Sequence, residues 1–260
     1  MFSLEIECHP DRLDLLIADL WEQGCAGISE LDDGRVRAFF EDAADSEWLR
    51  ARYPGAIARR EQERDWVQSA RDLLEPLSVG ARFFLVPEWR DDPTPPGRFR
   101  IAINPGLAFG TGVHETTQLA LEALEEYVRP DMALLDVGTG SGILSEAAAL
   151  LGAARVIACD IDPEAVAVAR RRVALSFVGS VTAVRSAAAD LVVANISPEA
   201  IVALAQELLR VLRPGGLLLA SGFETHEVEL IRASLPRVSE IRTKGNWALA
   251  VVRAAGKTGR

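Results

Sequence analysis

From residue 115 onward, apolar strands and amphipathic helices alternate along the chain, and this alternation is the strongest constraint on its fold. Residues 133–137, 154–160 and 189–196 are continuous apolar runs, which are typical of strands buried on both faces. Helical patterns fall between and around them, at 115–128, 142–152, 162–175 and 197–212. Further strands are expected at 216–223 and 246–253. This alternation predicts a Rossmann-like α/β domain with a doubly wound, mostly parallel sheet.

The first 64 residues follow a different pattern. Strand periodicity at 2–8 gives way to a helical pattern at 9–24, and an Asp-Asp-Gly turn at 32–34 indicates a hairpin. A short helix at 42–54 and a strand at 55–63 complete the order β-α-β-β-α-β, which predicts a small ferredoxin-like α+β domain. We therefore divide the chain into a ferredoxin-like domain (1–64), a linker helix and connecting segment (65–98) and an α/β domain (99–260).

Charge and composition limit the partners that this chain can have. The formal net charge is −10, and residues 1–64 alone carry fifteen acidic side chains and eight arginines, a net charge of −7. Such a surface suits a basic protein better than a nucleic acid, because phosphate binding requires clustered Lys and Arg. The scattered cysteines and histidines have no metal-ligand spacing, so no metal site is expected. We expect a cytoplasmic monomer without membrane association.

A glycine-rich loop, Gly138-Thr139-Gly140-Ser141-Gly142, follows the first apolar strand of the α/β domain. In open α/β sheets the ligand binds beyond the carboxyl ends of the strands, so this loop predicts a ligand site with Gly138 and Gly140 as contacts. A dinucleotide fingerprint needs G-x-G-x-x-G and a phosphate loop ends in Gly-Lys-Ser/Thr, but this loop has G-x-G-x-G and no lysine. These differences favour S-adenosylmethionine over a pyrophosphate ligand.

Two polar residues follow the neighbouring strands. Asp160 ends the second strand, where a carboxylate can accept hydrogen bonds from both ribose hydroxyls. Asn195 follows a later apolar run, where its side-chain carbonyl could accept an amine N–H and direct the lone pair of the amine at a methyl group. The alternative for Asn195 is a cap on the helix that begins near Pro198.

Residues 104–117 (NPGLAFGTGVHETT) resemble the signature of the PrmA family of bacterial methyltransferases, which act on large-subunit ribosomal protein L11. The segments LDVGTGSGIL, DIDPEAV, VVANI and the ending GNWALAVVR match that family in the same order. Residues 65–89 resemble the family's linker and the first segment of its catalytic domain, so the resemblance covers nearly the whole chain. It implies that residues 99–260 form a class I methyltransferase domain that binds S-adenosylmethionine and methylates lysine side chains and an N-terminal amine of this basic ribosomal protein. It also implies that residues 1–64 form a substrate-recognition domain.

The resemblance also implies roles for individual residues. The family's S-adenosylmethionine contacts correspond to Thr117, Gly138, Asp160 and Asn195. Phe109 corresponds to a wall of the methyl-transfer pocket, with a plain core aromatic as the alternative. His114 is interpreted as a loop residue and not as a base.

Two features depart from the family pattern. The sequence ARRRVAL stands where relatives have asparagines, and the segment 173–189 is shorter than usual, which puts the third strand and the adenine side of the pocket in question. Residues 177–184 are the candidate for what remains of that strand, with Gly179 and Ser180 near the adenine. The alternatives are a related methyltransferase with another protein or a small molecule as substrate, and a binding module that has lost catalysis.

Overall fold

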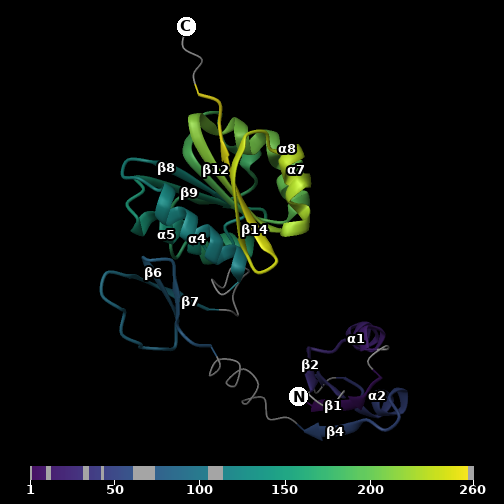
Figure 1. Ribbon diagram of the computed structural model, residues 1–260. Coiled ribbons are helices and arrows are strands. Elements are labelled where there is room, and N and C mark those ends of the chain that lie inside the picture. Colours follow the sequence, from purple (N-terminus) through teal and green to yellow (C-terminus); the bar gives the residue numbers. More distant parts are fainter. Residues whose placement is uncertain are drawn as a thin grey trace. The chain divides into compact units, whose positions relative to one another are not determined.

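The computed structural model describes residues 2–9, 13–31, 35–41, 44–60, 74–104 and 114–256. The chain divides into two compact units (Figure 1), an N-terminal unit of residues 1–74 and a C-terminal unit of residues 75–260. This division falls inside the segment 65–98 that the sequence analysis treats as a connection. Most of the predicted linker helix lies outside the described residues, and its last positions form a strand.

The described residues of the N-terminal unit form a four-stranded antiparallel sheet with two helices. The strands are β1 (Phe2–Glu7), β2 (Gly27–Leu31), β3 (Arg35–Phe40) and β4 (Ile57–Arg60), and the helices are α1 (Leu13–Glu22) and α2 (Ser46–Arg52). The sheet order β2-β3-β1-β4 is that of the predicted ferredoxin-like fold, which is confirmed. Asp45 starts α2 as its N-cap, because its side chain accepts the backbone N–H groups of Glu47 and Trp48.

The two faces of this sheet differ in chemistry, because successive residues of a strand point to opposite sides. Leu4 and Ile6 belong to the apolar core. Between them, Glu5 is buried on the other face and forms ion pairs with Arg35, Arg37 and Arg59. Burial alone would raise the pKa of Glu5, but the hydrogen bond from Arg37 and the charges of the three arginines outweigh it and hold this pKa below its ordinary value. Glu5 therefore stays ionised within its arginine cluster.

A small three-stranded sheet opens the C-terminal unit. Its strands are β5 (Leu77–Val79), β6 (Phe83–Pro87) and β7 (Phe99–Ile103), in the order β5-β6-β7. The proline-rich segment between β6 and β7 contains neither helix nor strand. The carboxylate of Glu125 accepts the backbone N–H groups of Ala81 and Arg82, which ties this sheet to helix α4 (Glu115–Tyr127).

The main sheet has seven strands in the order β10-β9-β8-β11-β12-β14-β13. Its strands are β8 (Ala133–Val137), β9 (Arg155–Asp160), β10 (Ser176–Val178), β11 (Ala189–Asn195), β12 (Leu212–Glu224), β13 (Val238–Lys244) and β14 (Trp247–Arg253). The first five are parallel, and β14 is antiparallel to both β12 and β13. The predicted Rossmann-like, mostly parallel sheet is confirmed.

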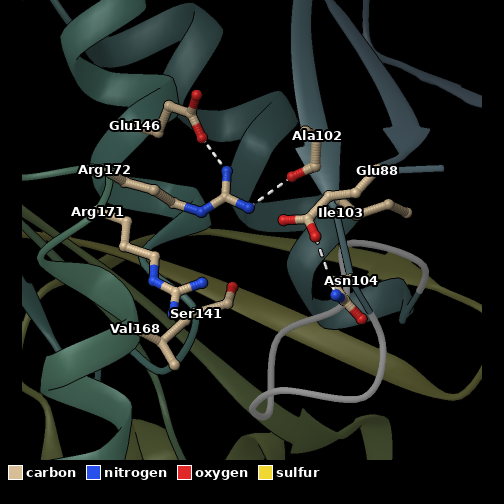
Figure 2. A pocket seen from close by; sticks show the side chains of 9 residues that line it. All are labelled: Glu88, Ala102, Ile103, Asn104, Ser141, Glu146, Val168, Arg171 and Arg172. Atoms are coloured by element: carbon tan, nitrogen blue, oxygen red, sulfur yellow. Dashed lines mark hydrogen bonds and ion pairs between the residues drawn. The ribbon is translucent and has the colours of Figure 1, made fainter. Parts of the chain in front are cut away.

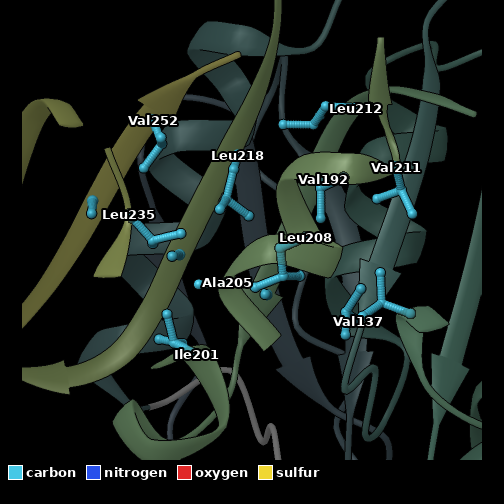
Figure 3. Close-up of a cluster of buried hydrophobic side chains, with 14 of the residues drawn as sticks. Val137, Val192, Ile201, Ala205, Leu208, Val211, Leu212, Leu218, Leu235 and Val252 are labelled. Atoms are coloured by element: carbon cyan, nitrogen blue, oxygen red, sulfur yellow. The ribbon is translucent and has the colours of Figure 1, made fainter. Parts of the chain in front are cut away.

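Helices cover both faces of this sheet. They are α4, α5 (Ile143–Leu150), α6 (Pro163–Ala169), α7 (Pro198–Arg210) and α8 (Val228–Ser234). Helices α4 and α5 lie together on one side, and α7 and α8 lie together on the other (Figure 1). One of the two apolar layers is built from α7 residues such as Ile201 and Leu208, which pack against Val192 and Leu218 of the sheet (Figure 3). Within the described part of the chain, no helix is long and apolar enough to cross a bilayer.

Helix α8 and strand β13 were not among the predicted elements, and two predicted elements differ clearly in their bounds. Helix α6 ends at Ala169, whereas a helix was expected through 175. The chain turns at 170–172 because only three residues separate Arg172 from β10, which must lie beside β9. Strand β12 begins at Leu212, whereas a strand was expected only from 216, and a shift in its pairing with β11 accommodates the extra residues.

A buried carboxylate lies near the end of β8. Asp136 is fully buried, and one of its oxygens accepts the hydroxyl groups of Thr139 and Ser145, both at 2.7 Å. No donor among the described residues reaches the other oxygen. Burial raises the pKa of Asp136 to about 6, although the two hydroxyl groups partly counteract this rise. Through these bonds, one side chain connects the strand, the glycine loop and helix α5.

The raised pKa of Asp136 predicts a pH dependence of stability. At pH 4 Asp136 is protonated in the folded protein. The protonated side chain contributes to the free energy of unfolding, and this contribution is lost as the pH rises from about 4 to about 6. A rise of about two pKa units corresponds to about 3 kcal/mol. We expect Asp136→Asn to remove this loss, so that the free energy of unfolding changes less between pH 4 and pH 7 than in the wild type.

Urea unfolding of the full chain at several pH values measures this difference. Asp131→Asn is the matched control, because Asp131 is exposed in the same unit and asparagine tolerates its positive φ of 72°. Parallel pH profiles for the wild type and Asp136→Asn would contradict the assignment.

Candidate functional site

The predicted site residues gather at the carboxyl ends of three adjacent strands. Gly138 follows β8, Asp160 ends β9 and Asn195 ends β11, and the sheet order places β8 between the other two. The chain passes from β8 to its neighbour β9 and later returns to β11, the neighbour on the opposite side of β8. The carboxyl ends of these strands therefore lie at the topological switch point of the sheet. Ligands of open α/β sheets bind at such points.

The glycine loop uses the backbone freedom of its glycines. Gly138 has a φ of 71°, and a Cβ on it would lie 2.3 Å from the Cγ2 of Ile196. Gly142 has a φ of 81° and begins α5 as its N-cap. Any side chain at these positions would be strained, and one at Gly138 would also clash with Ile196. These two positions are therefore limited to glycine, and the loop presents backbone instead of side chains there.

Asp160 anchors the same loop from the neighbouring strand. One carboxylate oxygen accepts the N–H of Gly140 at 2.9 Å, and the other accepts the N–H of Asp162 at 3.0 Å. Each oxygen of an ionised carboxylate has two acceptor sites, so both keep capacity for a ligand hydroxyl. The Asp160 side chain is therefore held in place by the loop and can still accept hydrogen bonds from a ligand.

Thr117 and Asn195 meet across the site from helix and sheet. The Asn195 Nδ2 donates to the Oγ1 of buried Thr117 at 3.3 Å. Ser197, not Asn195, is the N-cap of α7, and its hydroxyl accepts the N–H of Ala200. This arrangement rules out the capping alternative for Asn195. Its side-chain carbonyl has no donor among the described residues, which leaves it available to a ligand N–H.

The sequence analysis missed the part played by His114. This residue is the N-cap of α4, and its Nδ1 accepts the backbone N–H of Thr116 at 3.3 Å. Histidine is not among the preferred capping residues, so residue type alone did not indicate the role. Its place directly before the Glu-Thr-Thr start of a helical pattern was the available signal. Phe109, the predicted pocket wall, lies outside the described residues.

The short third strand is present as β10. It pairs in parallel with β9, with Val178 opposite Asp160, and the N–H of Gly179 donates to the backbone carbonyl of Asp160 at 2.8 Å. The 3₁₀ turn η2 (Val181–Ala183) follows directly. The shortened segment therefore still brings Gly179 next to Asp160, where the sequence analysis expected the adenine side of the pocket.

A cavity of about 230 Å³ lies on another side of the glycine loop (Figure 2). Its lining includes Ser141 of the loop, together with Glu88, Ala102, Ile103, Asn104, Glu146, Val168, Arg171 and Arg172. Arg172 forms an ion pair with Glu146 and donates to the carbonyl of Ala102 (Figure 2). None of the predicted cofactor contacts lines this cavity, so the strand ends remain the candidate site.

Comparison with known proteins agrees with this geometry. The family model "Ribosomal protein L11 methyltransferase (PrmA)" matches residues 55–254. A ribosomal protein L11 methyltransferase of Heliobacterium modesticaldum is 40% identical over 206 residues, which are 75% of this chain and 65% of the relative. One of Geobacter sulfurreducens is 37% identical over 256 residues, 88% of this chain and 85% of the relative.

A solved structure gives the same result. The crystal structure of a ribosomal protein L11 methylase from Lactobacillus delbrueckii subsp. bulgaricus is 33% identical, with a TM-score of 0.64. The match covers 70% of this chain and all of that chain. The chain thus spans from about two thirds to 85% of the length of the two relatives described above. The extent of the model match, the identities and the shared fold together show that the chain belongs to the ribosomal protein L11 methyltransferase (PrmA) family.

Proposed function

We propose that this protein is an S-adenosylmethionine-dependent methyltransferase that modifies amino groups of large-subunit ribosomal protein L11, on lysine side chains and at the N-terminal amine. The observation that carries the proposal is the meeting of Gly140 with Asp160, and of Thr117 with Asn195, at the switch point of the sheet. Membership of the family supports the same activity.

The residues at this edge fit the cofactor. A Cβ at Gly138 would clash with Ile196, so this position is limited to glycine and the loop presents backbone here, and no lysine is present in the loop to favour a phosphate. Asp160 would accept hydrogen bonds from the ribose hydroxyls, while the backbone of Gly138 and Gly140 would contact the cofactor. Thr117, in the first turn of α4, would hold the carboxylate of the cofactor with the free N–H groups of that turn. S-adenosylmethionine supplies a methyl group on a positively charged sulfonium.

Asn195 orients the amine that is methylated. A free lysine amine has a pKa near 10.4, so it must lose a proton before its lone pair can react. The side-chain carbonyl of Asn195 accepts one N–H of the neutral amine and thereby fixes the direction of the lone pair. We assign no general base: burial of the amine lowers its pKa, and water takes the proton. Phe109 remains our proposal for the apolar wall of this pocket.

The N-terminal unit is proposed to recognise the substrate, with a recognition domain of residues 1–64. Residues 1–64 carry a net charge of −7, which complements a basic ribosomal protein. Trp21 and Trp48 are about half exposed on its helices, and tryptophan is enriched among the residues that dominate protein interfaces. We expect the protein to be a cytoplasmic monomer that does not itself bind nucleic acid.

The rival functions would leave different parts of the structure unexplained. A binding module without catalysis has no need for a glycine loop at the strand ends. Nor does it need an Asn195 side-chain carbonyl that accepts no hydrogen bond from the described residues. A related methyltransferase with another substrate would keep the C-terminal unit unchanged, so only an assay with the ribosomal protein separates it from our proposal. Incubation with labelled S-adenosylmethionine and ribosomal proteins, followed by identification of the labelled band, makes that separation.

Asp160→Ala should weaken cofactor binding. It removes one or two hydrogen bonds to a charged group, each of roughly 1.5–3 kcal/mol, so the Kd should rise more than tenfold. Isothermal titration calorimetry with S-adenosylmethionine measures the change. Glu164→Ala is the control, because Glu164 is an exposed acid in the first turn of α6 that ends no strand. An unchanged Kd in Asp160→Ala would remove Asp160 from the ribose site.

Removal of the N-terminal unit should separate the two tasks of the protein. Deletion of residues 1–74 should leave the Kd for S-adenosylmethionine within about twofold, because the proposed contacts all lie in the C-terminal unit. Methylation of the ribosomal protein should be lost, as measured by transfer of a labelled methyl group. Retained transfer at the full rate would refute the recognition role.

A further inference from the structure

The C-terminal hairpin touches the capped end of helix α4. Trp247, the first residue of β14, lies with its ring 4.6 Å from the His114 ring, centroid to centroid, in an edge-on arrangement at 68°. Strand β14 runs beside α4 (Figure 1). Edge-to-face aromatic pairs at this separation are stabilising beyond the area that they bury. Trp247 therefore restricts the orientation of the His114 ring.

That orientation matters because His114 caps the helix. Its Nδ1 accepts the N–H of Thr116 and lies 2.9 Å from the Thr116 hydroxyl. Asn, Asp, Ser and Thr cap helices with short side chains, whereas the imidazole ring must be held at one angle about its bond to Cβ. The ring of Trp247 supplies this constraint from a segment more than 130 residues away in sequence.

The first turn of α4 carries the next contacts into the site. Thr117 follows Thr116, and its hydroxyl accepts from Asn195. Buried Ser221 donates to the carbonyl of Ala248, next to Trp247, at 3.0 Å and lies 3.5 Å from the carbonyl of Thr116. An unbroken series of contacts thus runs from the hairpin through the cap to the pair Thr117 and Asn195.

Other contacts hold the rest of the helix separately. Lys244 pairs with Glu122 at 2.9 Å, and Arg242 pairs with Glu126 at 2.6 Å. These ion pairs lie two and three turns along α4 from the cap. The hairpin therefore stays attached to the helix without Trp247, and the contact with His114 acts on the first turn alone.

We propose that Trp247 is a positioning residue, which orients His114 as the cap of α4 and thereby sets Thr117 against Asn195. This inference rests on the proposed function of those two residues in cofactor and amine binding. Trp247 acts on these two residues through its contact with His114. Loss of its ring leaves the cap free to turn, so the first turn of α4 frays and the cofactor must order it again on binding.

Hydrogen exchange of the ligand-free full chain tests the structural step. In Trp247→Ala the amide of Thr116 should exchange faster than in the wild type, while amides in the middle of α4 keep their rates. Trp247→Phe should restore the wild-type rate, because it keeps an aromatic ring. Lys244→Gln is the matched control: it breaks a hairpin contact with α4 but leaves the cap intact. Trp247→Leu replaces the alanine variant if that variant does not fold.

Calorimetry with S-adenosylmethionine tests the functional step. Loss of one aromatic pair corresponds to an increase in Kd of about 2- to 12-fold. In a His114→Asn background the cap no longer needs a held ring, so adding Trp247→Ala should change the Kd by less than about twofold. Equal losses in both backgrounds, or an unchanged Thr116 amide, would overturn the proposal. Absence of binding by the wild type would instead refute the proposed function, and exchange would still decide the role of Trp247.

Discussion

The candidate site depends on one buried carboxylate beneath the glycine loop. Asp136 lies in an environment that penalises its charge, and its hydrogen bonds to Thr139 and Ser145 join strand β8, the loop and helix α5. With the two ends of the loop held in this way, its glycines keep their positive φ angles and present backbone instead of side chains. Asp160 then completes the loop from the neighbouring strand through the N–H of Gly140. A polar anchor inside an apolar sheet thus sets the geometry on which ligand binding relies.

We propose that the two units divide binding by chemistry. The C-terminal unit offers oriented backbone groups and carboxylates to a small cationic cofactor, whereas the N-terminal unit carries most of the net negative charge of the chain. The arginines that surround Glu5 show that this charge is not uniform, because one face of the N-terminal sheet gathers Arg35, Arg37 and Arg59. A basic partner would therefore be attracted to the remaining acidic surface of this unit and repelled from that face.

Much of the fold could be predicted because local patterns agree with it. Strands β8, β9 and β11 are read from apolar runs, and Asp162 and Pro163 start α6 where capping rules place a helix start. The errors arise where neighbours override local preference. The arginine-rich sequence after Ala169 has helical character, yet the chain turns there to bring β10 beside β9. The role of His114 was missed for a different reason, because histidine is not among the preferred helix-capping residues.

The sequence by itself determined that a ferredoxin-like unit comes before a mostly parallel α/β sheet. It also placed Gly138, Asp160 and Asn195 at strand ends and Gly140 in the loop that follows β8. Periodicity and turn chemistry act over a few residues, so they are legible without the fold. Only the tertiary structure decided that Ser197 and not Asn195 caps α7, that Asn195 instead bonds to Thr117, and that Trp247 lies against His114. The contacts of Asn195 with Thr117 and of Trp247 with His114 join segments far apart in the chain, and they exist only once the sheet brings those segments together. The cap, in contrast, is a local contact between Ser197 and Ala200.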